Sequence, residues 1–234
     1  RVEIGPDARQ RPVRKWSDRK LSSVTFAPDG TLLFGEHMIG RTMGHPSITT
    51  KFELLPDRDV IGDGHVFRFT RQGKLLREYA TAAHGGMFGF LGITSTVLAD
   101  AGRRLIYVSE TSNAIRQYDL AGDRQLPDLV VFEKDPAMPM VLVMNPRPDG
   151  ELLVSNGAGF ARIDPDSGSV NRVYRLATPG WAAVSSSIDG RFAYVGNFWT
   201  GELVKVRLED GEVLARTNVG QKESLSGIAQ YPGR

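Results

Sequence analysis

The residues from Val184 to Val219 constrain the fold most, because short apolar runs alternate there with turns at regular intervals. The turns fall at residues 188–190, 197–201 and 208–211, and the first and third contain Asp-Gly. Asp-Gly between two β-rich runs is a strong hairpin signal, because glycine supplies the positive φ that a tight turn needs. The stretch therefore predicts four strands joined by hairpins into one antiparallel sheet.

The same unit occurs three more times before this stretch, and a fifth copy begins after it. In each copy a glycine closes the turn after the first strand, at Gly30, Gly102, Gly150, Gly190 and Gly233. The later glycines are spaced by roughly 40–50 residues, the length of one propeller blade. We predict an all-β fold, a β-propeller of four-stranded antiparallel blades with four complete repeats plus a partial fifth. Five or six blades are expected if the natural chain is longer.

In this interpretation residues 1–234 form a single β-propeller domain with an insertion loop over residues 37–64. Loops of this length in compact domains are usually functional or mobile, so the insertion is a candidate lid. Residues 1–20 contain two short β-like pieces, Val2–Ile4 and Val13–Trp16. The second is expected to be the outer strand of the last blade, a closing strap, and the alternative is a loose arm.

The C-terminal residues Ser226–Arg234 repeat an inner strand and its turn, and the middle strands of that fifth blade are missing. Unpaired strand edges are templates for association. The sequence therefore predicts an oligomer or a partner that pairs through the incomplete blade.

Composition excludes several classes of protein. The chain has a formal net charge of +2 and no cysteine, which rules out disulfides, thiolate catalysis and cysteine-based metal sites. No run of basic residues with interleaved aromatics is present, so a nucleic-acid partner is not expected. No apolar run approaches the roughly 18 residues of a membrane span.

Polar residues close the second strand of each predicted blade, at Glu36, Glu110, Asn156 and Asn197. Equivalent positions in successive blades meet at one mouth of the central channel. Oxygen ligands of this kind suit one divalent cation, Ca²⁺ or Mg²⁺. The alternative is that these side chains bond the following backbone and shape the turn.

All four histidines, His37, His45, His65 and His84, lie in the first part of the chain. Glu36 and His37 are adjacent at the same mouth and are the candidate catalytic residues, since such a pair suits acid–base or metal chemistry. No short ligand spacing such as His-x-His supports a metal role for the others. His65 opens a strand and is expected to pack there.

The loops that lead into the inner strands are apolar and aromatic. The candidate ligand-binding residues among them and their neighbours are Phe90, Met140, Trp181 and Trp199. Pockets for small organic ligands are lined in this way. The alternative is that these side chains plug the channel against water. Trp199 is the best candidate for exposed recognition, because it sits in a turn.

The stretch Phe192 to Gly201 (FAYVGNFWTG) resembles the YVTN repeat of bacterial propellers. Leu105–Asn113 and Leu152–Gly157 are similar to the same repeat, and Gly64–Tyr79 resembles the outer half of an NHL-type blade. The resemblance covers about residues 21–234. It implies a β-propeller and a periplasmic or secreted location.

Two main function classes follow from these observations. The first is a ligand- or protein-binding β-propeller with a composite site at the channel mouth, whose partner is a small organic molecule or a protein. The alternative, from a more distant resemblance, is a metal-dependent hydrolase or lyase of the gluconolactonase/regucalcin-like kind. That family places Glu, Asn and Asp around one divalent ion, which Glu36, Asn156 and Asn197 suggest, whereas the aromatic loops depart from it. A third option is a subunit that covers a redox partner.

Overall fold

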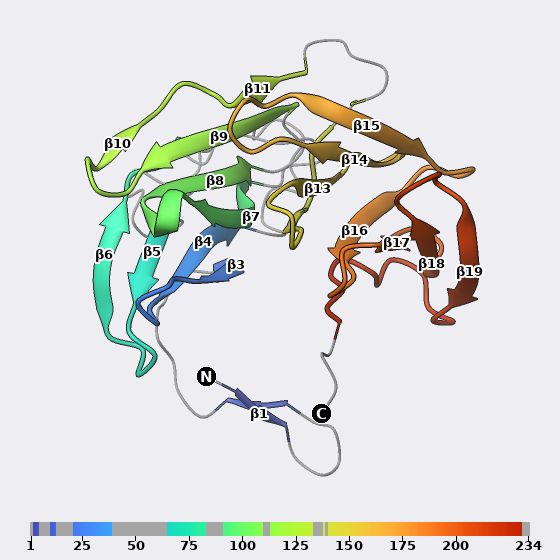
Figure 1. Ribbon diagram of the computed structural model, residues 1–234. Coiled ribbons are helices and arrows are strands. Elements are labelled where there is room, and N and C mark those ends of the chain that lie inside the picture. The colour runs from blue at the N-terminus through green and yellow to red at the C-terminus, as the bar shows by residue number, and fades with distance from the viewer. Residues whose placement is uncertain are drawn as a thin grey trace, which may run out of the picture.

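The computed structural model describes residues 2–4, 10–12, 21–38, 65–82, 91–109, 113–132, 138 and 140–230. Within these residues the chain is all-β, and four antiparallel blades follow one another around a common axis, as Figure 1 shows. The one helical element there is a 3₁₀ turn, η4 (Asp100–Gly102). No helix in the described part of the chain is long and apolar enough to cross a membrane. The predicted fold class is confirmed.

Blade 4 is the most regular of the four. Its strands, in pairing order from the axis outward, are β16 (Trp181–Ser186), β17 (Phe192–Asn197), β18 (Glu202–Arg207) and β19 (Val213–Asn218). The turn between β16 and β17 forms because the Asp189 carboxylate accepts the backbone N–H of Arg191 at 3.1 Å. Gly190 follows with φ of +69°, which favours glycine. The Asp-Gly hairpins that the sequence predicts are therefore present.

Blades 1 and 3 repeat this plan. Blade 1 consists of β3 (Leu21–Phe26), β4 (Leu32–Met38), β5 (Val66–Phe69) and β6 (Leu75–Tyr79). Blade 3 consists of β12 (Met144–Pro146), β13 (Leu152–Ser155), β14 (Gly159–Ile163) and β15 (Val170–Arg175).

Blade 2 departs from the plan at its outer edge. Its first three strands are β7 (Leu91–Ala99), β8 (Arg104–Ser109) and β9 (Ala114–Asp119). The outer strand is split into β10 (Arg124–Gln125) and β11 (Val130–Val131), which pair with different ends of β9. The four-strand plan expected from the sequence is thus modified here by a second short outer strand. The interruption contains Pro127, which lacks the N–H that a continuous ladder requires.

Apolar layers fill the spaces between successive blades. Side chains alternate along each strand, so one set faces the preceding blade and the other set faces the next. In β17, Val195 is buried in the layer shared with blade 3, whereas Tyr194 lies on the other face and is half-buried. The two side chains therefore lie on opposite faces of the sheet, as alternation along a strand requires.

The turns on the face opposite the mouth stack from blade to blade. A Cβ added at Gly102 would lie 3.0 Å from Pro28 of blade 1, and one added at Gly190 would lie 3.5 Å from Pro148 of blade 3. The proline of one Pro-Asp-Gly turn thus supports the turn glycine of the following blade. The contact occurs between blades 1 and 2 and between blades 3 and 4, whereas a Cβ at Gly150 of blade 3 would have no neighbour within 4 Å.

Arginines on the outer part of each blade hold the next blade. Arg77 pairs with Asp123 of blade 2 at 2.8 Å, and Arg104 pairs with Asp166 of blade 3 at 2.7 Å. Arg172 of blade 3 donates to backbone carbonyls in the β18–β19 turn of blade 4, at 2.9 Å for Asp210. Each of the three junctions therefore has one arginine that reaches an outer turn of the following blade.

The blades form an arc that is open between blades 4 and 1 in Figure 1. Near this opening β1 (Val2–Ile4) pairs with β2 (Gln10–Pro12) as a separate two-stranded hairpin. The predicted strap Val13–Trp16 lies outside the described residues, as does the insertion 37–64 apart from His37 and Met38 at the end of β4.

Residues 221–230 pass across blade 4 without forming the inner strand that the sequence predicts there. This segment nevertheless occupies the position that the inner strand of a fifth blade would have. A Cβ at Gly196 would lie 3.2 Å from Ile228 Cδ1, and the Gln230 side chain accepts the N–H of Ile188 at 2.9 Å. Gly35, the equivalent glycine of blade 1, is approached in the same way by Ile93 of blade 2. No strand forms because no second strand is present among the described residues to pair with the segment.

We expect Gly35→Ala to lower the free energy of unfolding by about 1–3 kcal/mol, because the new Cβ would lie 2.7 Å from Ile93 Cγ2 inside a paired sheet. Gly196→Ala should cost less, about 0–1 kcal/mol, because its two nearest neighbours, Ile228 and Leu225, belong to a segment without strand pairing and can move. Urea unfolding followed by circular dichroism compares the two variants. Equal losses would show that residues 221–230 are as firmly packed as an inner strand.

Candidate functional site

The candidate site lies at the mouth where the second strand of each blade ends. Four buried residues occupy equivalent places at these ends: Glu36, Ser109, Asn156 and Asn197. The cross-strand register supports the equivalence, because Glu36 faces Leu21, Ser109 faces Ile93 and Asn197 faces Trp181. Ser109 is the last described residue of β8, and the predicted ligand Glu110 lies outside the described residues.

The two asparagines bind loop backbone. Asn197 Oδ1 accepts the N–H of Thr200 at 3.1 Å, and its Nδ2 donates to the carbonyl of Pro179 at 2.8 Å. Asn156 Oδ1 accepts the N–H of Ala158 at 3.1 Å, and its Nδ2 contacts Met138 Sδ at 3.3 Å. Each side chain therefore joins the turn after its own strand to the link that leads into an inner strand.

Glu36 is buried and accepts the backbone N–H of His65 at 3.3 Å, across the insertion. The backbone of the other candidate catalytic residue, His37, pairs with Gly92 of blade 2. His65 opens its strand as predicted, and its Nδ1 lies 2.6 Å from the Glu78 carboxylate. His45 and His84 lie outside the described residues. Among the described residues no three His, Asp or Glu side chains come together as a metal-binding group.

Among the described residues four buried side-chain atoms have no hydrogen-bond partner, and two of these belong to residues at this mouth, Ser109 Oγ and Trp181 Nε1. Leaving such a group unpaired in the interior costs about 1–3 kcal/mol. The sequence analysis did not single out Ser109. Ser109 would have been identified if the equivalent position in blade 2 had been placed one residue earlier.

The predicted ligand-binding side chains differ in their exposure. Trp181 is 1% exposed and packs in the apolar layer between blades 3 and 4. Met140 is half-buried, with its Sδ 3.1 Å from where a Cβ of Gly157 would lie. Phe90 lies outside the described residues. Trp199 is 52% exposed, so of the three that are described it is the one that the structure presents to solvent.

Trp199 is held in place although it is exposed. Its ring packs edge-to-face against Phe198, with 5.3 Å between the ring centroids. On another side its Cδ1 lies against the backbone of Gly180, where any Cβ would overlap the ring. Gly180 has φ of +103°, a conformation that side chains rarely adopt. Asn197 forms hydrogen bonds with the same two loops, so the backbone that carries the indole is held in place and forms a fixed frame.

A polar groove of about 380 Å³ lies beside Trp199 at the ends of β18 and β19. We call it the blade 4 groove, and its lining residues are Thr200, Glu202, Arg216, Thr217 and Asn218. Arg216 NH1 forms an ion pair with Glu202 Oε1. Asn218 Nδ2 donates to the carbonyl of Thr200 at 2.9 Å, which holds the loop after Trp199 against β19.

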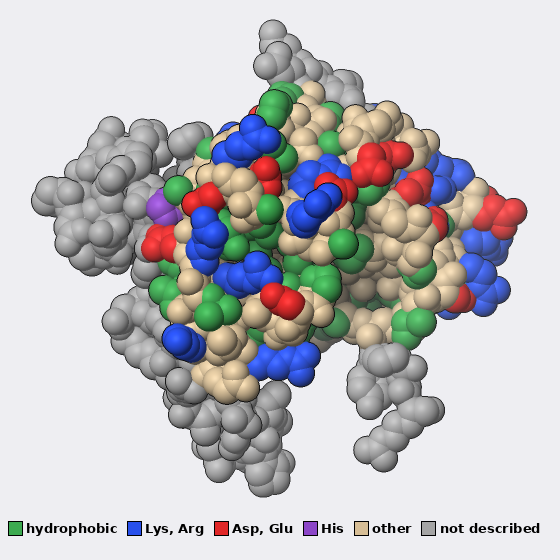
Figure 2. Space-filling model, turned by 60° about the vertical axis from the view of Figure 1, so that its left-hand side comes forward, with side chains coloured by type: hydrophobic (Ala, Val, Ile, Leu, Met, Phe, Trp, Pro, Cys, Tyr) green, Lys and Arg blue, Asp and Glu red, His purple; other side chains and the backbone are tan. Residues whose placement is uncertain are grey.

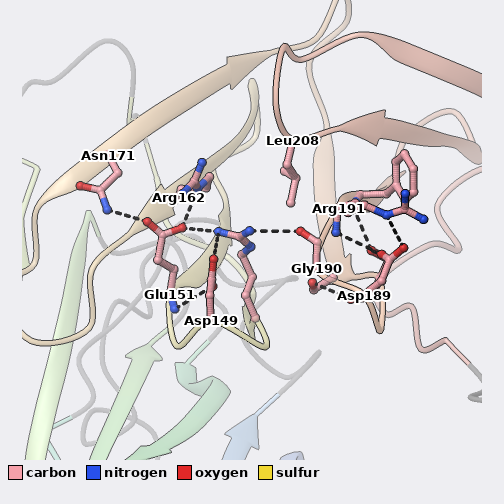
Figure 3. A network of polar contacts seen from close by, with 12 residues as sticks. Asp149, Glu151, Arg162, Asn171, Asp189, Gly190, Arg191 and Leu208 are labelled. Carbon is pink, nitrogen blue, oxygen red and sulfur yellow. Dashed lines mark hydrogen bonds and ion pairs between the residues drawn. The ribbon is translucent and has the colours of Figure 1, made fainter.

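A second cavity, of about 540 Å³, lies on the opposite face between blades 3 and 4, next to the network in Figure 3. Arg147 is 8% exposed and pairs with both Asp149 and Glu151, while Arg162 reaches the same Glu151. Burial alone would raise the pKa of Glu151, but hydrogen bonds from Arg162 and Asn171 outweigh it and hold the pKa below its usual value. The charges of Arg147 and Arg162 are therefore neutralised by carboxylates, which is typical of a structural network.

Charges of both signs are interspersed over the described surface in Figure 2. This distribution agrees with the formal net charge of +2 and shows no single-signed field on that face. The electrostatics of the visible face thus give no reason to expect a polyanionic partner.

No family model and no curated protein sequence matches the chain. Among solved structures, 1248 chains are similar in fold. One of them is virginiamycin B lyase from Staphylococcus aureus, with a TM-score of 0.57 and 13% sequence identity. The alignment covers 95% of this chain and 64% of that one, so this chain spans less than two thirds of the length of that structure. At this identity the likeness shows the β-propeller fold alone.

Proposed function

We propose that the chain is a binding β-propeller whose composite site lies at the mouth that carries Trp199, and whose partner is a small organic molecule or a protein. The observation that carries the proposal is the exposed indole of Trp199 on a frame fixed by Gly180 and Asn197. Exposed aromatic anchors of this kind dominate many binding sites, and a fixed frame reduces the entropy that binding must offset. The resemblance of residues 192–201 to the YVTN repeat agrees with a binding role.

The polar residues at the mouth hold loop backbone. Asn156 and Asn197 already use one oxygen lone pair each for a loop N–H, and Glu36 accepts the N–H of His65. A divalent ion held by these three residues would have to share those oxygens. We therefore derive no chemical step through a metal.

Trp199→Ala should abolish ligand binding at the mouth with little loss of stability, because half of the side chain is already in water. A thermal-shift screen of small organic compounds against the wild-type protein provides the measurement. A ligand at a hundred times its Kd stabilises a protein by about 2.7 kcal/mol, which raises Tm by several degrees.

Phe26→Ala is the matched control for this screen, because Phe26 is an exposed aromatic residue, at 68%, on blade 1. Compounds that stabilise the wild type and Phe26→Ala, but not Trp199→Ala, support the proposal. If every active compound also stabilises Trp199→Ala, the site is elsewhere.

A second candidate is a metal-dependent lyase or hydrolase that acts on a small organic substrate. The likeness in fold to virginiamycin B lyase and the burial of Glu36 at the mouth favour it. The test incubates the protein with virginiamycin B and Mg²⁺ or Ca²⁺ and follows the products by mass spectrometry. A lyase adds no water to its products, whereas a hydrolase adds one. Loss of turnover and of bound metal in Glu36→Gln would support this candidate over simple binding.

A further inference from the structure

The blade 4 groove and Trp199 are parts of one surface. Trp199 and Thr200 are adjacent in the β17–β18 loop, and Thr200 lines the groove. Asn218 fixes this loop to β19 through the carbonyl of Thr200. The volume of about 380 Å³ lies within the range of roughly 300–1,000 Å³ that is usual for small-molecule pockets. An aromatic face and a small polar groove therefore lie next to each other.

The lining of the groove carries no net charge. It contains one acidic and one basic side chain, Glu202 and Arg216, and these form an ion pair with each other. The other lining residues, Thr200, Thr217 and Asn218, are neutral. A phosphate, a polyanion or a cationic ligand would gain no net attraction here, so the groove suits a neutral polar ligand.

The groups in the groove are suited to hydroxyl groups. A carboxylate offers several acceptor lone pairs, a guanidinium offers a planar fork of donors, and a threonine hydroxyl offers both. The ion pair joins Arg216 NH1 to Glu202 Oε1, which brings the guanidinium and the carboxylate together at the groove. The indole of Trp199 adds a large apolar face with a polarised π-system.

Saccharides combine these two requirements, because a sugar ring has hydroxyls along its edge and a face of C–H groups. We propose that Trp199 and the blade 4 groove form a binding subsite for a neutral saccharide, with the C–H face against the indole and the hydroxyls at Glu202 and Arg216. This inference rests on the proposed binding function and names its ligand class.

The experiment titrates the wild-type protein with maltose, cellobiose and N,N′-diacetylchitobiose, using saturation-transfer NMR and calorimetry. At least one of these sugars should bind, and Trp199→Ala should weaken that binding by about tenfold or more, equal to about 1.4 kcal/mol. Glu202→Gln keeps the size of the side chain but removes the ion pair, so it should also weaken binding. Phe26→Ala should bind as the wild type does. Because the ligand is neutral, raising the salt concentration should change its affinity little.

The outcomes separate this inference from the proposed function. If no sugar of the three binds while the thermal-shift screen finds another ligand that depends on Trp199, the saccharide inference is wrong and the binding function stands. If a sugar binds Trp199→Ala as tightly as the wild type, the subsite is not at Trp199 and the inference is overturned.

Discussion

Trp181→Ala should lower the free energy of unfolding by about 3–5 kcal/mol, which is the usual cost of deleting a large buried aromatic side chain. Trp181 is 1% exposed and fills the space between blades 3 and 4 together with residues such as Leu153 and Phe160. Its removal leaves a cavity that paired strands on both sides cannot close. Urea unfolding followed by far-ultraviolet circular dichroism gives the value.

Two variants sharpen this test. Trp199→Ala is the matched control, and its loss should stay below about 1 kcal/mol because that side chain is half in water. Trp181→Phe keeps an aromatic ring but removes the indole N–H that has no acceptor, so its cost should be well below that of the alanine variant. A loss for Trp199→Ala equal to that for Trp181→Ala would contradict the assignment of one residue to the core and the other to the surface.

Glu151→Gln should lower the free energy of unfolding by about 1–3 kcal/mol at neutral pH, because it leaves the buried Arg147 with one carboxylate and Arg162 with none among its described ion pairs. The pKa of Glu151 is held below its usual value in the folded protein. Its contribution is therefore fully present above the unfolded pKa of about 4.3 and is lost as the pH falls through the folded value. The difference between the wild type and the variant should shrink accordingly in acid.

Urea unfolding at neutral pH and at a pH below about 4 measures this difference. Glu212→Gln is the matched control, because Glu212 pairs with Arg207 with more than half of its side chain exposed and should matter little. A pH-independent difference, or an equal loss in Glu212→Gln, would show that the ion pairs of Glu151 do not stabilise the folded protein in this way.

The turns and the blade count could be predicted from the sequence because their signals are local. An Asp-Gly pair with alternating residues on each side specifies a hairpin without reference to the rest of the chain, as at Asp189 and Gly190. The alternation in β17 similarly predicts which side chains share a face.

The ends of the strands at the mouth depend on bulges that the sequence does not show. The register shifts between Ile93 and Ser95 in blade 2, and a similar shift lies between Trp181 and Ala183 in blade 4. One residue of shift decides which residue of β8 lies opposite Ile93. A bulge of this kind is set by packing against the neighbouring strand, which a single stretch of sequence does not encode.

The sequence also could not separate Trp181 from Trp199. Both lie near the same end of blade 4. Trp181 is buried because blade 3 packs against β16. The blade 4 groove was missed for a related reason. Its residues come from the facing ends of β18 and β19 and become neighbours only when Glu202 pairs with Asn218.

The contacts that join the blades, the stacked turns and the outer arginines, all link consecutive blades. Such a chain of nearest-neighbour contacts behaves as a one-dimensional array, in which each unit draws stability from the units on either side. A closed ring would give every blade two complete neighbours, whereas among the described residues blades 1 and 4 each have one complete neighbouring blade. Cooperative opening should therefore start at these two ends and travel inward, so that blades 2 and 3 are the last to lose their hydrogen bonds.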